Sequence, residues 1–299
     1  MNDERTTGQE IVYVTLWENE WDSGDVAQFL DNLTEAGVNT VAFDIRWGLH
    51  EPSENTFDFS STQDICRRVT ERGFRLMPLV SIYYGPGWIF EKYPDIVELD
   101  SKQWSGQKNM SCAHPRSMPL ALSFIGKCLE ALDPYRDQIT AISVSWNNEH
   151  ETKFTQTHDR FRPYEPAANT KFEQYLSERN GSIEYWNKRW SKKFKSFGDA
   201  KPKLVNGAPT KDQIQQARID GQYIFDLYAF RRELLIECYT ACCRLIQSSG
   251  YQTWLHFGEM FSCVDAIYQG DIVFHMIDKE WLDIVVIDSN MSKLACLSG

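Results

Sequence analysis

The feature that most constrains the fold of this chain is an alternation of short apolar segments with segments of helical periodicity. In the first repeat, the apolar segment 11–17 precedes a stretch in which Val26, Leu30 and Leu33 recur at helical spacing before Gly37. That spacing indicates a helix with one buried face, and the glycine indicates its end. The next helix, through Ile65 and Val69, is likewise expected to end at Gly73. Six segments are predicted as strands: 11–17, 39–47, 74–84, the apolar start of 139–151, 252–260 and 282–290.

The alternation predicts an α/β fold. Strands that alternate with helices and are nearly continuous in apolar residues form a parallel sheet with both faces covered. A doubly wound sheet and a (β/α)8 TIM-type barrel both fit this pattern. No G-x-G-x-x-G motif follows the first predicted strand, which argues against a nucleotide-binding doubly wound sheet. We therefore predict the barrel, as a single domain over 1–299 with an excursion at about 152–209.

Polar and aromatic side chains cluster directly after the predicted strands. In a parallel barrel the carboxyl ends of the strands meet at one face, and active sites of this fold are built there. We expect these side chains to line a shared site. They are Trp17 and Glu18, Arg46 and Trp47, Tyr83 and Tyr84, Asn148 and Glu149, Glu259, and Asp288 with Asn290.

Glu149 is the candidate with the most specific chemistry. It follows an apolar segment and stands beside Asn148 in the stretch SWNNEHE. Partial burial raises the pKa of a carboxyl group, so such a group can donate a proton to a glycosidic oxygen while a neighbouring amide binds a sugar hydroxyl. The alternative is that Glu149 caps a loop or pairs with an arginine. Position alone does not separate the two interpretations.

Charge and composition restrict the partners. The formal net charge of -11 disfavours nucleic acid and anionic membranes, and no apolar run approaches a membrane span. Aromatic residues make up 13% of the chain and suit a cleft that binds rings with polar edges. The first residues carry no apolar leader, so we expect a cytoplasmic protein. The eight cysteines are scattered, and we expect them to be reduced, with no metal and no cofactor bound.

The excursion is expected to form helices of its own. Basic residues interleaved with aromatics can bind nucleic acid, but here the two kinds separate onto opposite helical faces, which predicts a packed stripe with a solvated back. The apolar residues on one face are Ile183, Trp186, Trp190, Phe194 and Phe197. Further helices are predicted from about Asp212 to Gln247 and around 271–281.

Three segments carry a resemblance to a known family: FDIRWGLHEPSENTFDF, SWNNE and FEQYLSERNGSIEYWNKRWSKKFKSF. In order and spacing they resemble the retaining barrel glycosidases, most closely the β-galactosidases of glycoside hydrolase family 42. The likeness covers roughly residues 10 to 290. It implies a carbohydrate substrate with a β-linked sugar and hydrolysis with retention.

Carried over residue by residue, the resemblance implies a set of site residues. Glu149 would be the general acid and base, and Asn148 would contact the 2-hydroxyl of the sugar. Arg46 would orient the catalytic carboxylates. Trp47 and Trp17 would offer stacking faces to a sugar ring, with core packing at the rim as the alternative for both.

Other residues near these motifs have narrower expectations. Tyr83 joins the expected substrate-binding set, whereas His50 and Glu51 are expected to fix the loop before Pro52 and not to touch substrate. The stretch SCAHP at 111–115 suggests nucleophilic Cys-His chemistry, but residues two apart in a loop rarely form such a pair, so we do not expect it.

The second catalytic carboxylate is the point where this sequence departs from the family. A retaining glycosidase needs a nucleophile about 5 to 5.5 Å from the acid. In the family that glutamate ends strand seven, whereas six strands are predicted here. Glu259 is therefore predicted as the substitute nucleophile or as a substrate ligand. Alternatively, KLVNG and DIVFHMI are strands that the pattern conceals.

Six parallel strands would leave an open barrel with unpaired edges. We therefore expect exposed apolar residues along the first strand and along 282–290, and either a homo-oligomer or a shortened chain. In such a barrel Glu259 would lie too far from Glu149 to serve as its nucleophile. The alternative function is then a non-hydrolytic carbohydrate-binding barrel or a truncated glycosidase that lacks its nucleophile.

Overall fold

The centre of the fold is a set of parallel strands that follow the order of the chain. The computed structural model describes residues 12–15, 26–100, 103–105, 108–155, 161–200, 221–258 and 269–287. One sheet has the order β1-β2-β3-β4 and a second pairs β5 with β6, and a parallel bridge between Ile142 and Thr253 links the two. Each of the six predicted segments contains a strand. The strands are β1 (Val12–Thr15), β2 (Thr40–Arg46), β3 (Arg75–Ser81), β4 (Ser143–Ser145), β5 (Trp254–Phe257) and β6 (Ile284–Ile287).

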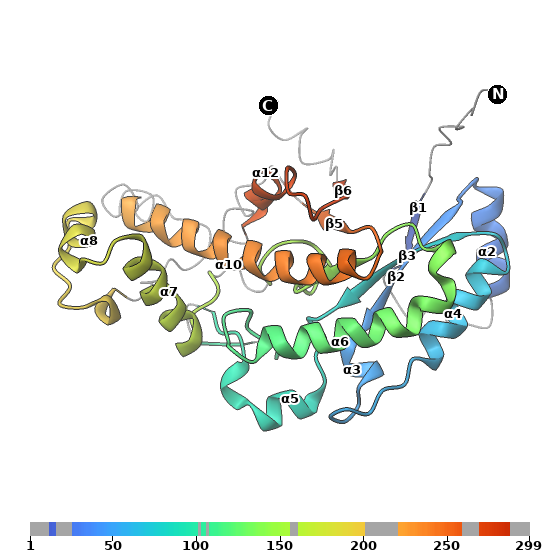
Figure 1. Ribbon diagram of the computed structural model, residues 1–299, viewed down its shortest axis with the longest axis horizontal. Coiled ribbons are helices and arrows are strands. Elements are labelled where there is room, and N and C mark those ends of the chain that lie inside the picture. Colours follow the sequence, from blue (N-terminus) through green and yellow to red (C-terminus); the bar gives the residue numbers. More distant parts are fainter. Residues whose placement is uncertain are drawn as a thin grey trace.

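Helices cover the outer face of these strands, and α6 and α10 lie side by side along it (Figure 1). Gly37 and Gly73, with φ of 78° and 82°, follow α2 and α4 and end them as predicted, since glycine adopts this conformation without strain. Among the described helices, none combines the length and hydropathy of a transmembrane segment. The longer helices are α2 (Val26–Glu35), α4 (Ser60–Thr70), α6 (Ser117–Leu132), α7 (Pro166–Arg179), α8 (Ile183–Trp190) and α10 (Gly221–Ser248).

Shorter helical segments connect these elements. The stretch DIVFHMI, considered as a strand, is helical instead, so the expected helix at 271–281 is confirmed in its first part. KLVNG lies outside the described residues. The short segments are α3 (Trp47–His50), α5 (Gly87–Lys92), α12 (Val273–Met276) and the 3-10 helices η1 (Pro94–Ile96), η2 (Asp133–Gln138), η3 (Phe197–Asp199) and η4 (Gly270–Ile272).

The strands have two distinct faces, and this sidedness positions the site. Val41, Phe43 and Ile45 of β2 belong to the large core shared with the helices. Ala42, between them, belongs to a separate inner cluster with Met77, Leu79, Ala141 and Trp254. Because side chains alternate along a strand, Asp44 and Arg46 continue this inner face toward the carboxyl end of β2.

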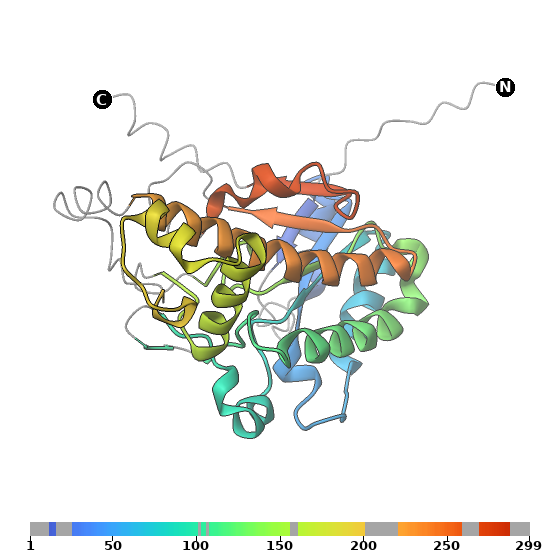
Figure 2. The same cartoon turned by 60° about the vertical axis from the view of Figure 1, so that its left-hand side comes forward.

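In its described residues the excursion after β4 forms α7, α8 and the short segment η3, and α7 and α8 pack against the first half of α10 (Figures 1 and 2). One buried carboxylate fastens it, because Asp226 accepts hydrogen bonds from Trp190 Nε1 at 2.7 Å and from two nitrogens of Arg189 at 2.7 and 2.9 Å. Trp186 and Trp190 are buried, as the predicted stripe requires.

The predicted stripe is wrong in its second half. The helix ends at Trp190 because Ser191 adopts a left-handed conformation with φ of 53°. Phe194 therefore lies beyond the helix, where the Asn187 side chain donates to its carbonyl oxygen and accepts from its N–H, both at 2.8 Å. Phe197 begins the separate segment η3.

Candidate active site

The carboxyl ends of β2 and β3 and the loop after β4 bring polar side chains into one connected group. Arg46 Nε donates to Asp44 Oδ2 at 2.5 Å, and the guanidinium carbon lies 5.0 Å from the centroid of the Tyr84 ring. The Tyr84 hydroxyl donates to the main-chain oxygen of Asn148 at 3.2 Å. Arg46 and Asn148, both predicted as substrate-binding residues, thus lie in one site.

His150 closes this group from the side of the β4 loop. It is buried, with a left-handed φ of 61°, and its Nε2 lies 3.8 Å from Asp44 Oδ2. Burial lowers the pKa of His150 to about 4, and the positive charge of Arg46 and the neighbouring His256 act in the same direction. Burial also raises the pKa of Asp44, against the opposing effect of Arg46. The imidazole is therefore neutral at pH 7.

Glu149 projects from a loop that a single side chain braces at both ends. Asn147 Oδ1 accepts from the main-chain N–H of Glu149 at 2.6 Å, and its Nδ2 donates to the carbonyl oxygen of Phe154 at 2.8 Å. Asn147 itself is fully buried. The Glu149 side chain, by contrast, is 41% exposed, so a carboxylate open to solvent stands on a fixed backbone.

Lys153 lies between two carboxylates of the same loop. Its Nζ is 2.9 Å from Glu149 Oε2 and also pairs with Glu151 Oε2. Burial lowers the pKa of Lys153, but the charges and hydrogen bonds of Glu151 and Glu149 outweigh burial and raise it. The lysine is therefore a cation at neutral pH. Glu149 thus has a cationic partner, although that partner is a lysine and not the arginine considered from the sequence.

Two aromatic residues predicted to bind substrate are buried in this structure. Trp47 is 1% exposed, its Nε1 donates to Glu51 Oε2 at 2.6 Å, and its ring stacks on Phe124 at 5.0 Å between centroids. Of the two interpretations of Trp47, these contacts match core packing at the rim. Tyr83 is 3% exposed and packs edge-on against Tyr84, and burial raises its pKa to about 12.

His50 and Glu51 form hydrogen bonds that fix the loop after β2. His50 Nδ1 donates to the carbonyl oxygen of Asp58 at 2.7 Å, and its Nε2 lies 3.1 Å from Thr62 Oγ1. Glu51 Oε1 accepts from the main-chain N–H of Asn55 at 2.9 Å. His50 and Glu51 thus have structural contacts, but apart from the bond from Trp47 to Glu51 these hold residues after Pro52 and not the loop before it.

Trp17 and Glu259 lie outside the described residues, so their predicted roles stay predictions. Gly258, which precedes Glu259 in the sequence, packs against the carboxylate of Glu151, because a Cβ atom there would collide with Glu151 Oε1. The end of β5 therefore directly adjoins the loop that carries Glu149.

The cysteines within the described residues are free thiols, as expected. In the SCAHP stretch, His114 Nε2 lies 3.4 Å from Asp95 and not beside Cys112 as a base would. A hydrogen bond with Cys238, followed by burial, raises the pKa of the Cys112 thiol, which is the opposite of nucleophile activation. No cluster of potential metal ligands occurs in the described part of the chain.

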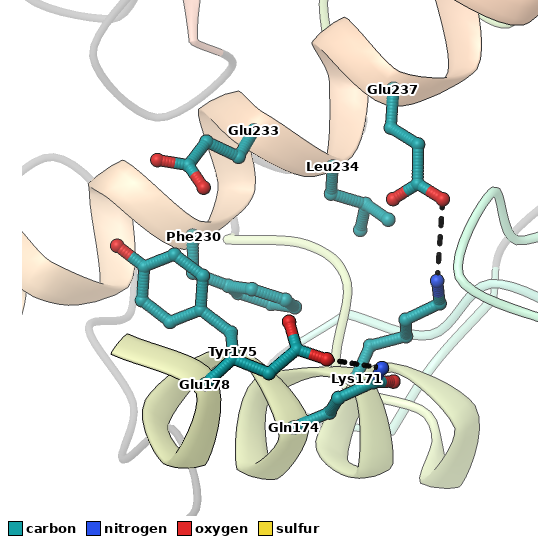
Figure 3. Close-up of a pocket in the computed structure, with 8 residues that line it drawn as sticks. All are labelled: Lys171, Gln174, Tyr175, Glu178, Phe230, Glu233, Leu234 and Glu237. Carbon is teal, nitrogen blue, oxygen red and sulfur yellow. Dashed lines mark hydrogen bonds and ion pairs between the residues drawn. The ribbon is translucent and has the colours of Figure 1, made fainter. Parts of the chain in front are cut away.

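A separate open hollow of about 240 Å³ lies between α7 and α10 (Figure 3). Its carboxylates have partners of their own: Glu237 faces Lys171 at 3.4 Å, and Glu178 accepts from Gln174 at 2.7 Å. Its floor is formed by Phe230 and Leu234. The third carboxylate, Glu233, pairs with Arg179, so each carboxylate that lines the hollow has a polar partner.

Several residues of the site were missed by the sequence reasoning. Asp44 had a readable signal, because it stands two positions before Arg46 and shares its strand face. Lys153 and Glu151 had no such signal, because 147–155 has neither the helical nor the strand periodicity that would place one side chain against another.

Comparison with known proteins identifies the family. The family model of glycoside hydrolase family 42, described as β-galactosidase, matches residues 16–284. The chain belongs to glycoside hydrolase family 42. The β-galactosidase LacZ of Heyndrickxia coagulans is 27% identical over 180 residues, which cover 58% of this chain and 26% of that protein. This family 42 chain thus spans about a quarter of the length of that curated relative.

Solved structures show the same fold. The catalytic domain of β-amylase from Paenibacillus polymyxa has a TM-score of 0.77 at 16% identity, covering 92% of this chain and 75% of that one. The β-galactosidase from Bacillus circulans sp. alkalophilus has a TM-score of 0.70 at 19% identity, covering 94% of this chain and 39% of that one. The fold is of the barrel glycosidase type, and the described residues of this family 42 member account for six parallel strands of it.

Proposed function

We propose that this family 42 chain hydrolyses a β-linked, galactose-type glycoside with retention, and that Glu149 is its general acid and base. The observation that carries the proposal is the position of Glu149: a 41% exposed carboxylate on a braced loop at the carboxyl end of β4, beside the group formed by Arg46, Tyr84 and Asn148. Family membership supports the choice of sugar.

In the proposed mechanism Glu149 first donates its proton to the glycosidic oxygen while a second carboxylate attacks the anomeric carbon and the leaving group departs. Glu149, now ionised, then removes a proton from the water that attacks the same carbon and releases the sugar. Asn148 is assigned to the 2-hydroxyl of the sugar, and Tyr84 holds the Asn148 backbone through its hydroxyl. Arg46, held against Asp44, contributes positive charge at the inner face.

Glu259 is proposed as the second carboxylate, and Trp17 as a ring-stacking residue, because both follow strands that end at this face. Retention requires the nucleophile to lie about 5 to 5.5 Å from Glu149. The role of Glu259 is therefore tested by trapping the covalent intermediate.

The experiment compares the wild-type protein with Glu149→Gln on nitrophenyl β-galactoside, with the α-galactoside as control. We expect turnover of the β-anomer alone and a loss on the order of a hundredfold or more in the variant, since an amide cannot donate and recover the proton. Wild-type turnover in the variant would remove Glu149 from the mechanism. Sugar binding without hydrolysis would favour the non-hydrolytic barrel.

The nucleophile is tested with a fluorinated deoxy-galactoside that carries a good leaving group, followed by peptide mass spectrometry. A sugar bound to the peptide that contains Glu259 is expected. Labelling of another carboxylate would assign the nucleophile elsewhere and leave the role of Glu149 intact.

A further inference from the structure

Lys153 is an ammonium group in an unusual place. Its side chain is only 3% exposed, although lysine is rarely buried unless it is paired. It forms ion pairs with two glutamates of its own loop, Glu149 and Glu151. The proposed mechanism assigns no step to this lysine.

The two carboxylates that contact Lys153 differ in exposure. The Glu151 side chain is 8% exposed and the Glu149 side chain 41%. Lys153 and Glu151 therefore form a buried ion pair. The ammonium group of this pair also contacts the more exposed carboxylate of Glu149.

The buried pair is held in place independently of Glu149. Gly258 at the end of β5 leaves room for the Glu151 carboxylate, because any Cβ there would collide with it. The N–H of Thr152 donates to the carbonyl oxygen of His256 at 2.7 Å, and the N–H of Lys153 donates to the carbonyl oxygen of Glu151 at 3.1 Å. β5 therefore holds the backbone that carries Lys153 and leaves room for the Glu151 carboxylate that the ammonium group contacts.

We propose that Lys153 is a positioning residue for the acid/base, fixing the Glu149 carboxylate at the mouth of the site in the orientation that proton transfer needs. The inference rests on the proposed role of Glu149. A misplacement of about 1 Å at a reacting group can cost on the order of a hundredfold in rate, so loss of the ammonium has a measurable effect.

The kinetic test uses Lys153→Met with β-galactosides of graded leaving groups. If Lys153 acts through Glu149, the variant loses about 10- to 100-fold in kcat/KM on methyl or phenyl galactoside, where protonation of the leaving group matters, and little on dinitrophenyl galactoside, where it does not. In a Glu149→Gln background, Lys153→Met should cost nothing more. Equal losses on all substrates, or the same loss in both backgrounds, would show a merely structural role.

Two variants control for folding and charge. Lys153→Met removes the cationic partner of the buried Glu151 carboxylate, so the double variant Lys153→Met/Glu151→Gln, which removes both members of the pair, should show the same dependence on the leaving group. Lys171→Met removes a lysine that pairs with exposed Glu237 in the hollow between α7 and α10, and it should leave kcat/KM unchanged.

A cross-linking experiment separates this inference from the proposed function. A water-soluble carbodiimide converts the exposed carboxylate of Glu149 into an O-acylurea. Lys153, once its ammonium group has lost a proton to solvent, attacks the activated carbonyl, so that a side-chain amide forms and the carbodiimide leaves as its urea. The peptide link is expected in wild-type protein and in Glu151→Gln, and absent in Glu149→Gln. Its absence in Glu151→Gln would overturn the contact, whereas failure to turn over any glycoside would refute the proposed function and the positioning role with it.

Discussion

Replacing Glu165 with glutamine should remove a specific pH dependence of stability. Glu165 is 1% exposed, and its Oε2 accepts from the main-chain N–H groups of Leu99 and Tyr164, both at 3.1 Å, while Oε1 accepts from the Ser111 hydroxyl. Burial, and then the nearby charge of Glu98, raise the pKa of Glu165 from 4.5 to about 7. The folded protein therefore holds this proton up to about pH 7, whereas the unfolded chain releases it near pH 4.5.

The sign and size of the effect follow from this difference. The stabilising contribution is complete below pH 4.5 and is lost as the pH rises through about 7. At about 1.4 kcal/mol per pKa unit, the shift corresponds to a loss of about 3 kcal/mol in the free energy of unfolding. Glutamine keeps the shape of the protonated acid and cannot ionise, so Glu165→Gln should not show this loss.

The assay is urea unfolding of the full chain at pH 5 and pH 8. The wild-type protein should lose about 2 to 3 kcal/mol more than Glu165→Gln between these two values. Glu178→Gln is the matched control: it removes one negative charge from an exposed position of α7, where the side chain is solvated in both states. Parallel pH curves for the wild type and Glu165→Gln would refute the reasoning.

Three further substitutions test separate contacts. His150→Asn keeps a residue that tolerates φ of 61° and removes an imidazole of pKa about 4. The free energy of unfolding of the wild type should therefore fall by about 3 kcal/mol as the pH falls from 6.5 to 4, and that of the variant should not. An equal loss in both proteins would contradict this. Trp47→Phe deprives the buried Glu51 carboxylate of its 2.6 Å donor and should lower the free energy of unfolding by about 1–3 kcal/mol, whereas a raised KM at unchanged stability would point to sugar stacking. Gly258→Ala places a Cβ against Glu151 and should lower the melting temperature through about 1–3 kcal/mol of overpacking; an unchanged value would show that the carboxylate has room to move.

The arrangement of strands and helices was predictable because burial leaves a direct record in the sequence. Apolar continuity marked the strand segments, and glycines at 37 and 73 marked two helix ends, so these predictions were confirmed. The end of α8 was not predictable in the same way. A left-handed serine at 191 stops the helix, and the apolar spacing continues past it through Phe194 without any change of pattern.

The candidate site was predictable only in part. Strand ends collect at one face of a barrel, so Arg46 and Asn148 could be placed together from order alone. The partners of Glu149 could not, because they depend on how one irregular loop closes. Lys153 contacts Glu149 because of the path of the loop backbone and because Gly258 leaves room for the Glu151 carboxylate. Residue spacing in the sequence predicts neither feature.

The brace formed by Asn147 has a consequence for ligand binding. A loop tied at both ends by one buried amide has already lost its conformational freedom when the protein folds. A sugar that enters the site therefore meets a preorganised loop, and the entropic cost of ordering it is absent from the binding free energy. Differences in affinity between sugars should then report the contacts that each sugar makes, and not the order that it imposes on the protein.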